Sequence, residues 1–80
     1  MQQLNSKNYD EVVVTIRNQS GSDMVPMAPH SGLALMDYLT SGEAAKHVQI
    51  TSRDGHVIVV RTTDISLVEP HKKVDLKEYI

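Results

Sequence analysis

Apolar and polar residues alternate along much of the chain, and this pattern predicts a protein built mainly from strands. Residues 11–17 (EVVVTIR) present one wholly apolar face, while Val13 makes the opposite face partly apolar. After a polar turn segment, residues 24–28 (MVPMA) predict the returning strand of a hairpin. Because Pro26 has no amide hydrogen to donate, we expect this second strand at the edge of a sheet.

A single helix is predicted after this strand pair, over residues 31–40 (SGLALMDYLT). Leu35, Met36 and Leu39 fall on one stripe at helical spacing, which is typical of a helix that faces a core. Ser31 stands where its hydroxyl can cap the free amides of the first turn. The four glycines are dispersed along the chain and suit turns.

Two β-rich segments flank Asp54-Gly55, and they form the clearest local pattern in the chain. The dipeptide Asp-Gly between such segments favours a two-residue hairpin turn. Ile58 and Val60 then lie on the outer face, so we expect the second strand to be central, with a further strand beside it. The core-facing positions in this register are Val48, Ile50, Val57 and Val59.

The order of these elements predicts an α+β fold: a mainly antiparallel sheet of four to five strands with one helix packed on a face. The expected order is strand, strand, helix and three further strands, the last over residues 64–69 before Pro70. We expect residues 1–8 to be a flexible tail and residues 9–70 to form a single domain. Residues 71–80 are expected to be a second tail or a short helix.

The composition restricts the chemistry that is open to this protein. Its 80 residues include no cysteine, tryptophan or phenylalanine, which excludes disulfides, thiolate metal sites and a cysteine nucleophile. The net charge of −2 gives no general attraction to nucleic acid or to an anionic membrane. No apolar segment is long enough to span a bilayer, so we expect a cytoplasmic protein without a membrane partner. A core this small favours homo-oligomerisation.

No catalytic or metal-binding pattern stands out. The four histidines lack the spacing of a zinc site, and the serines fall mostly at turns or at the start of the helix. His30-Ser31 looks like a base beside a nucleophile, but a helix cap explains it better. The sequence contains no phosphate-binding loop and no nucleophile elbow. We therefore expect a non-catalytic protein with no cofactor and no metal.

The candidate functional residues suggest binding. Arginine offers a planar fork that suits phosphate or carboxylate, so an anionic ligand is expected to use Arg17, Arg53 and Arg61, together with His56. Methionine is common at adaptable contact surfaces, and an apolar edge strand needs a cover. The candidate interface residues are Val13, Met24, Val25, Met27 and Tyr38.

Three functions remain open at this point. The first is a protein-interaction module, such as an adaptor, an assembly subunit or an inhibitor, that acts as a homo-oligomer. The second is a protein that binds or sequesters an anionic, nucleotide-like small molecule at subunit boundaries. The third is a weak nucleic-acid binder that uses the hairpin face around Arg53 and His56, although the charge and the absence of Phe and Trp, which leaves three tyrosines for base stacking, argue against a nucleic-acid partner.

Overall fold

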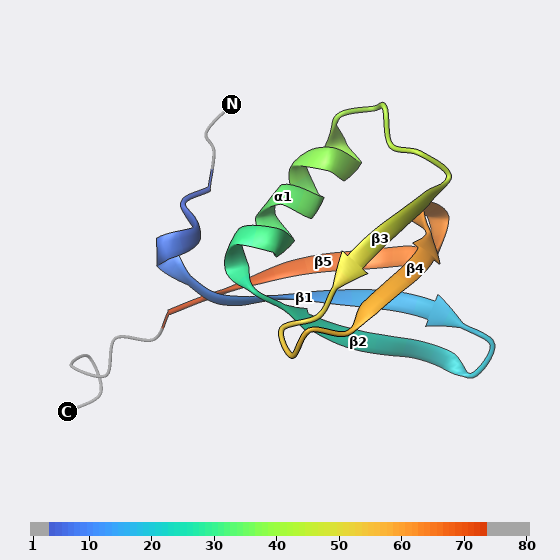
Figure 1. Cartoon of the computed structure of the whole chain (residues 1–80), viewed down its shortest axis with the longest axis horizontal. Helices are drawn as coiled ribbons and strands as arrows, with labels where there is room; N and C mark the ends of the chain where they lie inside the picture. The colour runs from blue at the N-terminus through green and yellow to red at the C-terminus, as the bar shows by residue number, and fades with distance from the viewer. Residues whose placement is uncertain (1–3, 74–80) are drawn as a thin grey trace.

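The structure, a computed structural model, describes residues 4–73 and contains five strands and one α-helix (Figure 1). In chain order the elements are η1 (Ser6–Asn8), β1 (Tyr9–Asn18), β2 (Gly21–Met27), α1 (Pro29–Thr40), β3 (His47–Thr51), β4 (Val57–Arg61), η2 (Thr62–Asp64) and β5 (Ile65–Lys72), where η1 and η2 are short 3-10 helices. This is the α+β class, in the expected order of strands and helix. The prediction of one sheet of four to five strands is wrong, because the strands divide into an antiparallel sheet β2-β1-β5 and a separate hairpin β3-β4.

Strand β1 is the centre of the larger sheet and supplies most of its buried surface. Val12 and Val14 have no exposed surface, and both face the helix side of the sheet. β2 begins at Gly21, directly after the turn at residues 19–20, and Gly21 adopts a φ of 127° that side-chain-bearing residues rarely reach. Within residues 4–73 β2 pairs only with β1, so Pro26 lies on an edge strand, as its missing amide donor predicts.

Helix α1 begins two residues earlier than predicted, at Pro29, with Ala28 as the capping residue. The fixed φ of proline suits the first helical position, where the missing amide hydrogen has no partner to lose. Ser31 therefore lies inside the first turn and makes no capping hydrogen bond. Leu33 and Leu35 are buried and anchor the helix over β1 and β5.

The hairpin β3-β4 packs beside α1 on the same face of the sheet (Figure 1). Its register differs by one residue from the prediction. Gly55, with a φ of 94°, closes a three-residue loop in which the Ser52 amide donates to the His56 carbonyl at 2.8 Å. A one-residue change turns every β4 side chain to the opposite face. The inward residues are Val48, Ile50, Ile58 and Val60, whereas Val57 and Val59 are 59% and 64% exposed.

Two further expectations differ from the structure around the last strand. β4 has no strand on its other side within residues 4–73, so it is not central. β5 does not end before Pro70 but continues to Lys72. Pro70 is tolerated there because β5 lies at a sheet edge, so no further strand needs the amide hydrogen that proline lacks. Residues 71–80 were expected to form a tail or a short helix, and those beyond residue 73 lie outside the described residues.

Candidate functional site

The four residues proposed from sequence for an anionic ligand lie in two separate places. Arg17 stands near the end of β1, and Arg61 ends β4, and both line one open cavity of about 690 Å³ with Asn18, Gln19 and Asp64. Arg53 contacts Asp10 at the other end of β1. Arg17 lies seven positions along the strand from Asp10, a span of about 23 Å at 3.3 Å per residue. One ligand-sized anion cannot contact both arginine groups within one protomer.

The two arginines of the cavity are held by the segment that links β4 to β5. The Arg17 Nη2 donates to the Thr63 carbonyl at 2.6 Å, and the Arg61 Nε lies 3.5 Å from Asp64 Oδ2. The Arg61 and Asp64 side chains are 64% and 35% exposed, so solvent screens this pair. Two guanidinium groups against one carboxylate leave the cavity with an excess of positive charge.

Arg53 fastens the hairpin loop to the larger sheet instead of offering a free charge. Its Nη1 donates to the Asp10 carbonyl at 3.1 Å and lies 3.6 Å from Glu11 Oε2. Its backbone amide donates to the Pro26 carbonyl at 2.8 Å. These contacts join three segments that are distant in sequence, and they explain why this arginine follows the end of β3.

A Ser-Asp-His cluster occupies the same loop, but its order does not activate a nucleophile. The Asp54 carboxylate accepts from the Ser52 hydroxyl, and its other oxygen is 3.0 Å from His56 Nδ1. In a catalytic triad the histidine lies between the serine and the acid, whereas here the acid is central. The Ser52 hydroxyl, and then the His56 ring, hold the pKa of Asp54 below its ordinary value. The cluster closes the three-residue loop.

The five residues proposed for an interface divide between the surface and the core. Val25 and Met27 are 8% and 3% exposed and pack inside the protomer, so they are not available to a partner. Val13 lies on the opposite face of the sheet from Val12 and Val14, but at 8% exposed it is as buried as Val25. Tyr38 is 37% exposed on α1, and its hydroxyl accepts from the Ala45 amide at 2.7 Å.

The outer face of the sheet, the one turned away from α1, carries two exposed apolar side chains. Met24 and Leu67 lie on either side of Thr15 in the register, one on each edge strand. They are 69% and 51% exposed. We call these two residues, with half-buried Thr15 between them, the outer-face row. Sequence reasoning missed Leu67, although its alternation with Val68 along the last strand places it on the outer face.

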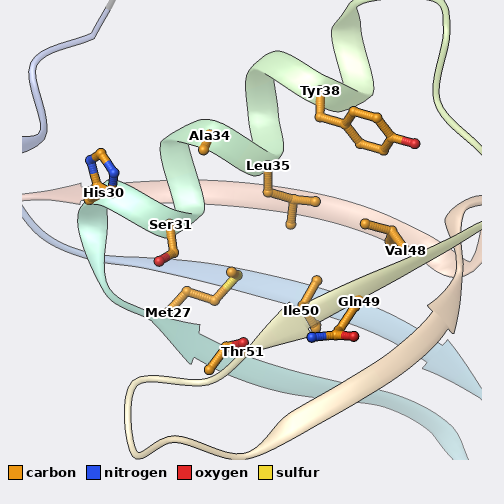
Figure 2. A pocket seen from close by; sticks show the side chains of 10 residues that line it. All are labelled: Met27, His30, Ser31, Ala34, Leu35, Tyr38, Val48, Gln49, Ile50 and Thr51. Carbon is orange, nitrogen blue, oxygen red and sulfur yellow. The ribbon is translucent and has the colours of Figure 1, made fainter.

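A groove of about 410 Å³ separates α1 from β3 (Figure 2). Leu35 from the helix, Ile50 from β3 and Met27 from the end of β2 converge at its floor (Figure 2). Ser31, Ala34 and Tyr38 stand along the helix side. Sequence reasoning did not predict this groove, because it is formed by three segments whose relative positions depend on the packing of the hairpin.

Comparison with protein-family models, with curated proteins and with solved structures finds no match to this chain. Within residues 4–73 no three histidine, aspartate or glutamate side chains converge to hold a metal ion. The twelve-residue α1 is too short to cross a membrane, and the described part of the chain holds no longer helix.

Proposed function

We propose that this chain is a non-catalytic protein-interaction module that acts as a homo-oligomer, with the outer-face row as the contact between two copies. The observation that supports this is the exposure of Met24 and Leu67 at matching positions on the two edge strands of a sheet. Only one face of that sheet is covered by the helix and the hairpin in the described structure. A second copy would cover the other.

The contribution of Leu67 to the affinity between two copies follows from the symmetry of the contact. A stable interface buries about 800 Å² on each partner. In a two-fold contact each residue is used twice, once from each copy. Fully burying a leucine or methionine side chain contributes about 1.5–3 kcal/mol. Burying the exposed half of Leu67 in both copies therefore contributes about 1.5–3 kcal/mol across the pair, which corresponds to about ten- to a hundredfold in the dissociation constant.

The experiment is size-exclusion chromatography with light scattering on the wild type and two variants. Leu67→Glu should weaken dimerisation by about a hundredfold, because it removes this apolar burial and places one charge from each copy in the contact. Val59→Glu is the matched control, since Val59 is also well exposed, at 64% against 51% for Leu67, but lies on the hairpin and not on the larger sheet. A wild type that stays monomeric at about 1 mM would refute the proposal, as would a dimer that Leu67→Glu leaves intact.

A second candidate function, the binding of an anionic small molecule, is favoured by the cavity that Arg17 and Arg61 share. Guanidinium groups hold phosphate or carboxylate through paired hydrogen bonds. Inorganic phosphate or adenosine diphosphate should then raise the melting temperature of the wild type. The increase should disappear in Arg61→Ala and persist in Arg53→Ala. No increase with either probe would remove this candidate.

A further inference from the structure

The groove between α1 and β3 exposes backbone groups as well as side chains. The ladder of the hairpin is bounded by hydrogen bonds from the Ser52 amide to the His56 carbonyl and from the Thr62 amide to the Lys46 carbonyl. In an antiparallel pair the residues that bond across the ladder alternate with residues that point their backbone groups outward. The β3-side residues bonded at the two boundaries, Lys46 and Ser52, have even numbers. The odd-numbered Gln49 and Thr51 therefore point their amides and carbonyls away from β4.

Strand β2 occupies this edge of β3 only at the hairpin loop. There the Arg53 amide donates to the Pro26 carbonyl at 2.8 Å. The chain then leaves the sheet, because α1 begins at Pro29. In the part of the chain that the structure describes, no hydrogen bond reaches the outward backbone groups of Gln49 or Thr51. The groove is thus the position that a longer β2 would have filled beside β3.

The lining defines the chemistry of an occupant. Its floor is apolar and closed, since Met27, Leu35 and Ile50 are 3%, 6% and 1% exposed. None of the ten lining residues is an aspartate, glutamate, lysine or arginine. The volume of about 410 Å³ is within the range of ordinary ligand pockets. An uncharged extended segment fits, with alternate apolar side chains toward the floor and its backbone toward β3.

We propose that this groove binds an uncharged extended peptide segment of a partner protein, which pairs with the free edge of β3 as an added strand. Strand addition supplies affinity through backbone hydrogen bonds and selectivity through the side chains that enter the floor. The chain's own residues 74–80 do not have the required chemistry, because they include Asp75, Lys77 and Glu78. The groove lies on the opposite side of the sheet from the outer-face row, so the proposal stands independently of homo-oligomerisation.

The experiment uses a capped five-residue peptide, Thr-Val-Thr-Val-Thr, titrated into the isotopically labelled full chain and followed by NMR. The amides of Gln49 and Thr51 should shift on binding and exchange more slowly with solvent. A version of the peptide N-methylated at its pairing amides should bind about tenfold more weakly or worse, the loss expected for two hydrogen bonds. Ala34→Lys should abolish binding, because Ala34 is exposed on the helix side of the groove. Asp37→Lys, on the same helix but outside the groove, should bind as the wild type does.

Several results would overturn this proposal. One is the absence of shifts at millimolar peptide; another is a set of shifts confined to the outer-face row. Equal binding of the N-methylated peptide, or of Ala34→Lys, would show that strand pairing in the groove is not the mode of binding. If the Gln49 and Thr51 amides of the free protein become protected as its concentration rises, a second copy occupies the groove in place of a partner peptide.

Discussion

Replacing Gly32 with alanine tests how closely α1 packs on the sheet. In an exposed helix this substitution stabilises by about 1 kcal/mol, because glycine loses more backbone freedom on folding. Here the added methyl group would lie 2.7 Å from both γ carbons of Val12, and closer still to its Cβ. Non-bonded carbons prefer about 3.5–4.0 Å, so helix and strand would have to separate by about 1 Å.

The strand cannot retreat to relieve this contact. Val12 has no exposed surface, and β1 is paired on both sides, with β2 and with β5. Overpacking of this type costs about 1–3 kcal/mol, and the upper end applies where the clash involves a Cβ fixed to the backbone. After subtraction of about 1 kcal/mol for helix propensity, we expect Gly32→Ala to lower the free energy of unfolding by about 2 kcal/mol. For a domain of this length the melting temperature should fall by about 8–16 °C.

Urea unfolding followed by far-ultraviolet circular dichroism measures this change directly. Ala34→Gly is the control, because Ala34 is exposed on the same helix and its replacement reports propensity alone, a loss of about 1 kcal/mol. The close packing of α1 on β1 would be refuted if Gly32→Ala stabilised the protein by about the amount that Ala34→Gly destabilises it. An unchanged slope against urea would show that both variants unfold from the same native state.

Three further predictions concern the hairpin. Ile58→Ala should lower the free energy of unfolding by about 1–2 kcal/mol, whereas Val59→Ala should change it by less than about 0.5 kcal/mol. Urea unfolding measures both changes. A larger loss for Val59→Ala than for Ile58→Ala would support the register predicted from sequence instead. Gly55→Ala should cost about 1–2 kcal/mol in the same assay, because alanine is strained at a φ of 94°. Ser52→Ala should raise the pKa of Asp54 toward its ordinary value, measured by NMR titration of the carboxyl carbon, because the serine hydroxyl is the main cause of its lowering. A lowered native pKa means that the stability supplied by this loop is present above the unfolded-state pKa of Asp54 and is lost as the pH falls through the native value.

The candidate surfaces were predictable only in part. The apolar character of Met24 and its place on an edge strand follow from the sequence, because alternation and the missing donor at Pro26 are local properties. Whether Val25 or Met24 faces outward depends on which side of the sheet the helix covers, and that is a long-range contact. The arginines show the same limit, since all three lie in or beside strands but only Arg17 and Arg61 share a cavity.

The amino-acid sequence by itself determined which segments extend and which segment coils. Runs of β-branched residues disfavour the helix and suit the pleated surface of a sheet. The apolar stripe of residues 31–40 specifies a helix with one apolar face, which must pack against another element of the fold. These are short-range effects, so the order of elements in the α+β fold could be predicted without any knowledge of contacts.

Tertiary structure alone decided how these elements meet. The hairpin loop has three residues where two were predicted, and this difference points Ile58 inward and Val59 outward. Local alternation cannot choose between the two registers, because both faces of β4 are apolar. Glycine is typical of turns, but Gly32 lies inside α1, where its lack of a side chain lets the helix approach Val12. The helix begins at Pro29 and so leaves the edge of β3 unpaired, which creates the groove. Each outcome depends on the distance between segments far apart in sequence, which only the packing of the complete chain sets.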